Sequence, residues 1–237
     1  MFRFKQFTVQ QDKCAMKVGT DGVLLGAWAP IGHNPQSILD IGAGTGLIAL
    51  MLAQRSNAGQ IDAIEIDNNA YEQAVGNFED SPWADRLFCY HAGLDEFIDE
   101  MEDEEYELII SNPPFYSEDY ITGNEQRDKA RFNFSLPFEE LAEAVSLLLR
   151  GDNGIFAVVL PYKEEENFIA IAKECSLFPF RITRVKGTPK AEIKRSLIAF
   201  KKLETEHILT DELIIETERH NYTPEYIELT KDFYLKI

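Results

Sequence analysis

Short apolar runs alternate with helix-like patterns along most of this chain, and this alternation constrains the fold more than any other feature. Seven runs have the length of strands, and the segments between most of them carry apolar residues at helical spacing. Such alternation is typical of a parallel α/β sheet with helices on both faces. We therefore expect a mostly parallel sheet of seven strands, at residues 37–41, 61–64, 87–90, 106–110, 154–160, 181–185 and 196–200.

Length and composition favour one elaborated domain. The 237 residues are 45% hydrophobic, which is enough to bury a sizeable core. We expect an N-terminal extension at 1–36, a core at 37–203 and a C-terminal extension at 204–237. The first ten residues contain no apolar h-region of a signal peptide, and no apolar run is long enough to cross a bilayer, so secretion and membrane insertion are not expected.

The cysteines and histidines predict neither a disulfide framework nor a metal site. Cys14, Cys89 and Cys175 are odd in number, far apart and outside any CxxC pair, which favours a reducing, cytoplasmic setting. The four histidines show no metal-ligand spacing. We expect no metal.

Charge is unevenly distributed. The formal net charge of −18 disfavours a polyanionic partner at long range. Residues 95–107 hold nine carboxylates and no cation, which is typical of a solvated helix face, whereas residues 181–202 hold eight cations against Glu192 alone. This basic stretch is either a pair of strands whose lysines face water or a contact for nucleic acid.

A glycine-rich turn follows the first predicted strand. Residues 40–46 read Asp-Ile-Gly-Ala-Gly-Thr-Gly and lead into a predicted helix, whose first backbone N–H groups are unpaired. A nicotinamide-binding turn would have the pattern GxGxxG and would require glycine where this chain has Leu47. Glu65 ends the second strand about 20 residues after the turn, where doubly wound folds hold a ribose diol. Asp67 is a weaker candidate for this role.

The DxGxGxG spacing resembles motif I of the class I S-adenosylmethionine-dependent methyltransferases, which implies a Rossmann-like fold and S-adenosyl-L-methionine as cofactor. By this resemblance, Asp40 orders the loop and approaches the amino acid part of the cofactor, and Glu65 accepts hydrogen bonds from its ribose. The glycines of the cofactor-binding loop are Gly42, Gly44 and Gly46. The acidic residue that often follows the third strand in these enzymes is not evident at residues 91–94, so backbone groups would recognise adenine there.

The second motif, Asn112-Pro113-Pro114-Phe115, follows the fourth predicted strand. In the strand order 3-2-1-4-5 the first and fourth strands are neighbours, so this loop and the glycine turn face one crevice. The motif resembles the [DNS]PP[YFW] sequence of enzymes that methylate planar nitrogens. Asn112 and the Pro113 carbonyl would each accept one N–H, the second proline would restrict the loop, and Phe115 would stack on a flipped base.

The N-terminal segment narrows the choice of methyl acceptor. Residues 4–28, the two motifs, residues 127–131 and the ending Asp-Phe-Tyr-Leu at 232–235 resemble the bacterial tRNA1(Val) (adenine-37-N6)-methyltransferases over nearly the whole chain. The resemblance implies methyl transfer to N6 of adenine 37 in a valine tRNA. It also suggests that Lys17, Thr20 and Asp21 close over the cofactor.

We expect two groups of cations to hold tRNA phosphates. The first follows the NPPF motif, and the second flanks the crevice mouth from the basic stretch. They are Arg127, Lys129 and Arg131, and Lys186, Lys190, Lys194 and Arg195. The alternatives are an enzyme of the same NPP type that acts on rRNA or a protein glutamine amide, and a non-catalytic tRNA-binding module. No membrane, metal or obligate protein partner is indicated.

Overall fold

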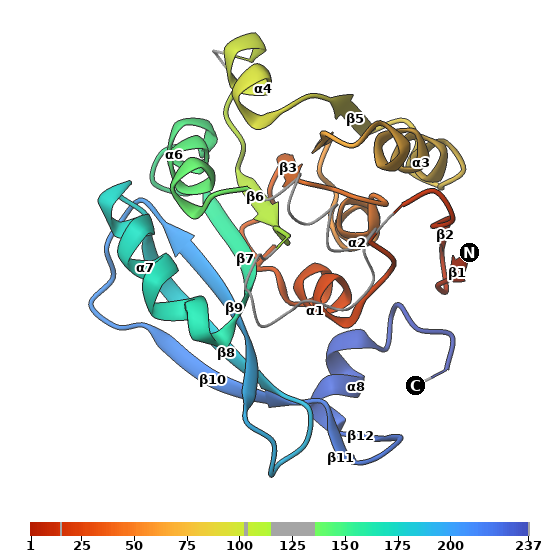
Figure 1. Cartoon of the computed structure of the whole chain (residues 1–237), viewed down its shortest axis with the longest axis vertical. Helices are drawn as coiled ribbons and strands as arrows, with labels where there is room; N and C mark the ends of the chain where they lie inside the picture. Colours follow the sequence, from red (N-terminus) through yellow and green to blue (C-terminus); the bar gives the residue numbers. More distant parts are fainter. Residues whose placement is uncertain (15, 102–103, 115–135, 237) are drawn as a thin grey trace.

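The computed structural model describes residues 1–14, 16–101, 104–114 and 136–236, and its centre is a twisted eight-stranded sheet. The strand order is β10-β8-β9-β7-β6-β3-β4-β5 (Figure 1). Helices cover both faces of this sheet, which confirms the predicted Rossmann-like architecture. Two small antiparallel pairs, β1-β2 and β11-β12, lie outside it.

Five parallel strands carry the N-terminal two thirds of the sheet, and their order is the predicted 3-2-1-4-5. All but β5 are rich in branched apolar residues and almost wholly buried, as expected of strands covered on both faces. The strands are β3 (Ser37–Ile41), β4 (Gln60–Glu65), β5 (Leu87–His91), β6 (Leu108–Ser111) and β7 (Ile155–Pro161).

The remaining three strands make the sheet mixed. β9 (Ile193–Lys201) pairs antiparallel with β7 and with β8 (Phe178–Lys186). β10 (Leu209–Ile214) then pairs parallel with β8. The prediction of seven strands was therefore one too few. Four of the six residues of β10 are exposed, so this edge strand lacks the apolar run from which strands were predicted.

Alternate residues of the strands form two cores, one on each face. Ile38, Ala157 and Val159 pack with the face covered by α1 (Thr20–Trp28), α2 (Leu47–Arg55) and α8 (Pro224–Thr230). Leu39 and Val158 pack with the face covered by α4 (Leu94–Glu100), α6 (Phe138–Leu148) and α7 (Glu165–Glu174). α3 (Asn68–Glu79) contributes Phe78 to the first core, and a short 3₁₀ turn, η2 (Tyr162–Glu164), precedes α7.

The predicted extensions are packed into the domain. Trp28 of α1 donates from Nε1 to Thr183 Oγ1 of β8 at 2.8 Å, and Arg55 of α2 donates to the carbonyls of Gly26 and Ala29. The Lys5 backbone N–H donates to Phe233 O at 2.8 Å, so the two termini lie side by side (Figure 1).

Four short strands and one helix cap complete the fold. β1 (Phe2–Arg3) pairs with β2 (Thr8–Val9), and β11 (Glu216–Glu218) pairs with β12 (Asn221–Tyr222). α8 begins as predicted, with Thr223 accepting from Tyr226 N and Pro224 at the first helical position.

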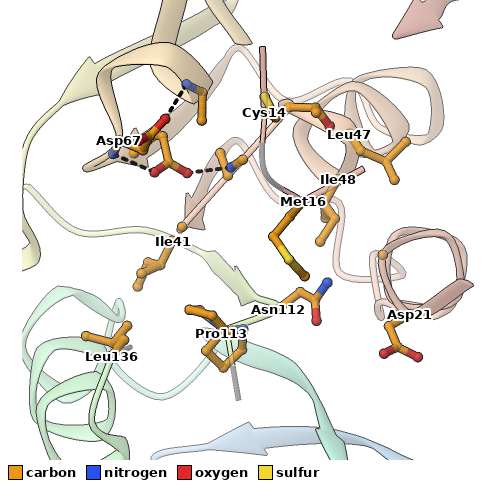
Figure 2. A pocket seen from close by; sticks show the side chains of 18 of the residues that line it. Cys14, Met16, Asp21, Ile41, Leu47, Ile48, Asp67, Asn112, Pro113 and Leu136 are labelled. Atoms are coloured by element: carbon orange, nitrogen blue, oxygen red, sulfur yellow. Dashed lines mark hydrogen bonds between the residues drawn. The ribbon is translucent and has the colours of Figure 1, made fainter. Parts of the chain in front are cut away.

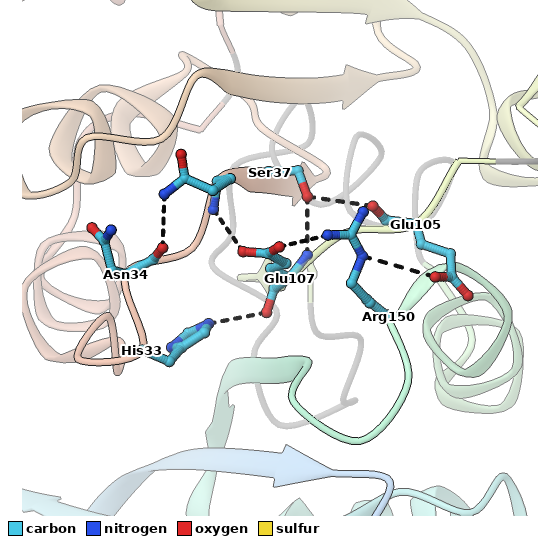
Figure 3. A network of polar contacts seen from close by, with 7 residues as sticks. His33, Asn34, Ser37, Glu105, Glu107 and Arg150 are labelled. Atoms are coloured by element: carbon cyan, nitrogen blue, oxygen red, sulfur yellow. Dashed lines mark hydrogen bonds and ion pairs between the residues drawn. The ribbon is translucent and has the colours of Figure 1, made fainter.

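A polar network pins the strand starts, at the edge of the sheet where β3 and β6 begin (Figure 3). The Glu107 carboxylate accepts from Gln36 N at 2.7 Å and pairs with Arg150, while its carbonyl contacts His33 Nε2. The Glu107 N–H donates to Ser37 Oγ. Residues at the starts of both strands are therefore tied together, which fixes the register between β3 and β6.

Within the described part of the chain, no helix has the length and apolarity needed to cross a bilayer.

Candidate functional site

A cavity of about 580 Å³ opens at the carboxyl ends of β3, β4, β5 and β6 (Figure 2). This is the edge at which doubly wound folds bind ligands. Both sequence motifs contribute to its wall, together with the N-terminal segment. The lining includes residues 16–22, 41–45, 64–67, 92–94 and 112–114, with Cys14, Leu47, Ile48, Ala70, Leu136, Glu140, Pro161 and Arg195.

The three glycines of the first motif all have positive φ, but they serve different needs. A Cβ atom on Gly42 or Gly44 would meet nothing within 4 Å, so the backbone there faces open space. A Cβ atom on Gly46 would lie 2.4 Å from Phe78 Cε1 of α3. Gly42 and Gly44 therefore leave room for a ligand, whereas Gly46 allows the loop to pack against α3 as it enters α2.

Glu65 closes the other side of this loop. Its carboxylate accepts from Gly44 N at 2.7 Å and from Asp67 N at 2.8 Å, and it lines the cavity. Burial raises the pKa of Glu65, although its backbone hydrogen bonds act in the opposite direction. Each oxygen accepts one backbone N–H and has capacity for another donor. Asp67 instead caps α3 by accepting from Ala70 N.

Asp40 lies behind the glycine loop and is not among the residues that line the cavity. Its side chain is fully buried; Oδ2 accepts from Ala49 N at 3.1 Å, and Oδ1 has no hydrogen-bond partner among the described residues. Burial, and to a lesser degree the charge of Glu65, raises the pKa of Asp40 to about 7. The contact with α2 supports the loop-ordering part of its predicted role.

Asn112, Pro113 and Pro114 stand on the cavity wall directly after β6 (Figure 2). Ser111 Oγ donates to Ile41 O at 2.9 Å, so the ends of β6 and β3 are tied together just before the two motifs begin. α1 packs closely here, since a Cβ atom on Gly22 would lie 3.1 Å from Leu47 Cδ2 and 3.9 Å from Asn112 Nδ2. Phe115, the last residue of the motif, lies outside the described residues.

The N-terminal strap, residues 10–14 and 16–21, crosses the cavity between α3 and α1. Two buried amides of α3 hold its start: Asn77 accepts from Gln10 N and donates to Thr45 O, and Gln73 accepts from Lys13 N. The predicted residues Lys17, Thr20 and Asp21 follow on the strap, and all three line the cavity. The strap and the glycine loop thus share the anchor residue Asn77.

The basic stretch reaches the same edge, because β9 begins where β7 ends and Pro161 pairs with Arg195. Arg195 donates from Nε to Asp21 Oδ2 at 2.8 Å, which joins β9 to the strap. Lys186 pairs with Glu212 of β10. Lys190 and Lys194 are exposed, and neither pairs with a carboxylate within the described part of the chain. Arg127, Lys129 and Arg131 lie outside the described residues.

Several lining residues were not singled out as site residues in the sequence. Met16 contributes a 42% exposed side chain, and Ile66, directly after Glu65, is 52% exposed. Because Ile66 directly follows Glu65 at the end of a predicted strand, the sequence could have indicated that it lines the site. Leu136, just before α6, Glu140 in α6 and Pro161 at the end of β7 had no such signal, because only the folded chain brings them to this edge.

Comparisons with known proteins agree over the full length of the chain. A protein named tRNA1(Val) (adenine(37)-N6)-methyltransferase from Flavobacterium johnsoniae is 70% identical over 100% of both chains. This chain belongs to the tRNA1(Val) (adenine(37)-N6)-methyltransferase family. A relative of that name from Bacteroides fragilis is 46% identical over 100% of this chain and 98% of its own.

A broader family model agrees with this assignment, and a solved structure agrees with the fold. The model of the methyltransferase small domain matches residues 23–127. A crystal structure described as a predicted O-methyltransferase from Agrobacterium tumefaciens superposes with a TM-score of 0.70 over 90% of this chain and 96% of its own. At 21% identity that structure supports the fold alone.

The cavity of this methyltransferase suits a cationic ligand. Two carboxyl groups with raised pKa values lie at or behind its wall, and one oxygen of Asp40 has no donor among the described residues. A positive charge placed here would favour the ionised form of both groups. Open space above Gly42 and Gly44 gives such a ligand close access to the backbone. Among the described residues, no group of three His, Cys, Asp or Glu side chains could hold a metal ion.

Alanine at the glycines should separate ligand binding from folding. Gly46→Ala should lower the free energy of unfolding most, because its Cβ clashes with Phe78 and its φ of 75° is strained. Gly44→Ala should cost about 1–2 kcal/mol through its positive φ alone, yet weaken cofactor binding by filling ligand space. Urea unfolding and calorimetric titration with S-adenosylmethionine measure the two effects. Equal stability losses with unchanged affinity in Gly44→Ala would contradict this division.

The buried Asp40 should make stability depend on pH. Its folded-state pKa of about 7 exceeds the ordinary value of 3.8, so between these values the folded state binds more protons than the unfolded state. Stability should therefore fall as pH rises through this range. Asp40→Asn removes the titration, and its stability relative to wild type should increase from about pH 5 to about pH 8. Urea unfolding at both pH values checks this, and parallel pH profiles would count against a raised pKa.

Proposed function

We propose that this protein transfers a methyl group from S-adenosyl-L-methionine to N6 of adenine 37 in tRNA1(Val), the reaction named for its full-length relatives. The observation that carries the proposal is that the glycine loop and Asn112-Pro113-Pro114 open onto one cavity. A donor held along the first and an amino group held by the second would therefore meet.

Residues of this chain would hold the cofactor along the β3 and β4 side of the cavity. Glu65 accepts the ribose hydroxyls, and the backbone of Gly42 and Gly44 approaches the amino acid portion. Ile66, Ala92, Gly93 and Leu94 form an apolar wall beyond Glu65 that suits a purine ring. When bound, S-adenosylmethionine supplies a methyl group activated by the positive charge on sulfur.

The Asn112-Pro113-Pro114 side of the cavity would make the adenine amino group a better nucleophile. The lone pair of the adenine amino group is delocalised into the ring, so the planar nitrogen is a poor nucleophile. Asn112 Oδ1 and the Pro113 carbonyl each accept one N–H, which favours a pyramidal nitrogen and stabilises the positive charge that develops on it. Two successive prolines restrict this loop. Alignment of this kind supplies about 7–11 kcal/mol of a barrier, so no strong general base is required.

The strap would exclude water above the reacting groups. Lys17, Thr20 and Asp21 lie on the cavity wall, and the Asp21–Arg195 ion pair fastens the strap to β9. Arg195 is thereby committed to a carboxylate, and Lys186 is likewise paired. Lys190 and Lys194 are consequently the better candidates for phosphate contacts at this edge, and Arg127, Lys129 and Arg131 stay predictions from the sequence.

A single-stranded anticodon loop suits the reaction, because a base there can leave its neighbours at low cost. The locally basic edge gives this otherwise acidic protein a place for phosphates. A protein glutamine amide would fit the same pair of acceptors but would not need these cations. The acceptor is therefore decided by experiment with tRNA and protein substrates side by side.

Asn112→Ala should retain cofactor affinity and lose most turnover, because it removes one acceptor from the amino group without touching the glycine loop. An oxyanion-hole donor of comparable position is worth about 10²–10³ in kcat, and a similar loss is expected here. Single-turnover transfer of labelled methyl to tRNA1(Val) measures it, with nucleoside analysis to locate the product at adenine 37. Full activity in the variant would overturn the role assigned to Asn112. Labelling of a release-factor protein, as a protein with a glutamine amide acceptor, instead of tRNA would overturn the proposed acceptor.

Lys190→Ala and Lys194→Ala should each weaken tRNA binding and reduce the slope of log affinity against log salt by roughly one phosphate contact. Cofactor affinity should not change. Lys202→Ala is the matched control, because it removes the same charge from the same basic stretch just beyond the other end of β9. Filter binding at several salt concentrations measures the slopes. Three identical slopes would mean that Lys190 and Lys194 do not contact RNA.

A further inference from the structure

A second cavity of about 360 Å³ adjoins the first across the N-terminal strap. Val18, Gly19 and Thr20 line both cavities, so the strap is a wall that they share. The other wall comes from the two ends of the chain and from the β11-β12 hairpin with α8, which lie together in Figure 1. Its remaining lining residues are Phe2, Ile215, Glu216, Tyr222, Tyr226, Tyr234 and Lys236.

We propose that this cavity is a second nucleobase site, which takes an unpaired base of the tRNA substrate other than the methylated adenine. The inference rests on the proposed function, since it requires an RNA whose target base enters the first cavity. A nucleotide close to that base in the loop would reach the far side of the strap.

Four aromatic residues line the second cavity. Tyr222 and Tyr226 have ring centroids 5.2 Å apart, and Phe2 and Tyr234 pack edge-on at 6.3 Å. Tyr226 is 4% exposed and shares a hydrogen bond with Tyr234, whereas Tyr222 is 39% exposed. Tyr222 is therefore a partly exposed ring at the cavity, supported by the buried ring of Tyr226. Bases stack on such faces whatever their identity.

Tyr222 is held in place by the local backbone. It ends β12, and the next residue, Thr223, caps α8 and donates its backbone N–H to Ile215 O at 3.0 Å. His220, with a φ of 68°, forms the turn that leads into the strand. A ring fixed in this way loses little conformational entropy when a base stacks on it.

Polar groups around the rings also match a nucleotide. Lys236 places a cation at the cavity that suits a phosphate, and Glu216 places a carboxylate that can accept from an exocyclic amine of the base. An aliphatic protein side chain would use neither group. The shared wall places this cavity directly beside the site of reaction, which favours RNA over an unrelated partner.

The decisive experiment combines Tyr222→Ala with abasic substitutions in the anticodon loop of tRNA1(Val). One abasic position should weaken binding to the wild-type enzyme by roughly 5- to 150-fold, the range expected for loss of one stacked base. The Tyr222→Ala variant, in contrast, should bind this abasic tRNA as tightly as it binds the intact tRNA, because the stacking contact is already lost. Additive losses at every abasic position, or wild-type affinity in Tyr222→Ala, would overturn the proposal.

Three controls keep the result specific. Tyr222→Trp retains a stacking face and should retain affinity for tRNA. Phe88→Ala removes a 45% exposed ring from β5, at the far edge of the sheet, and should not change tRNA affinity. Cofactor affinity and melting temperature of Tyr222→Ala should equal those of wild type, and a loss of cofactor affinity would indicate a purely structural role for the ring. If wild-type enzyme methylates no tRNA, the proposed function itself fails; if it does but Tyr222 is silent, only this inference fails.

Discussion

The hydrogen bond from Ser111 Oγ to Ile41 O joins the two strand ends on which the site depends. β3 and β6 are parallel neighbours, so the loops that follow them leave the sheet at the same edge. One loop carries the glycines and the other carries Asn112 and the two prolines. At the opposite edge, the network around Glu107 ties the starts of the same strands, and the register between them is therefore fixed at both ends.

Electrostatics within this frame favour a positively charged ligand. Asp40 and Glu65 are both buried, and their pKa values are raised because desolvation disfavours the charged form. A cationic ligand would favour the ionised form of both groups and so offset this desolvation. The glycine loop is held between these carboxyl groups, with Glu65 bonded to Gly44 and Asp40 bonded to the helix that follows. Order in the loop and affinity for the ligand thus share the same side chains.

The strap, residues 10–14 and 16–21, connects the cofactor cavity with the surfaces proposed to meet RNA. It is anchored to α3 through Asn77 and Gln73 and to β9 through the Asp21–Arg195 ion pair. One side of residues 18–20 faces the first cavity and the other side faces the aromatic cavity. An acidic protein can bind RNA in this arrangement because its stacking groups and unpaired lysines are local, whereas the repulsion from its net charge acts over longer distances and is screened by salt.

The sequence by itself determined the parallel half of the sheet and the two motifs, since long apolar strands and glycine or proline punctuation are local signals. It also placed Glu65, because an acid at the end of the second strand has a fixed position in this architecture. It did not reveal β10, whose exposed edge lacks an apolar pattern, or the pairing of Arg195 with Asp21, which joins residues 174 positions apart. Only the tertiary structure decided that Asp40 lies behind the loop, that α3 anchors the strap, and that the two chain ends enclose an aromatic cavity. These features arise from contacts between distant segments, and no local pattern of residues encodes which distant segment a side chain will meet.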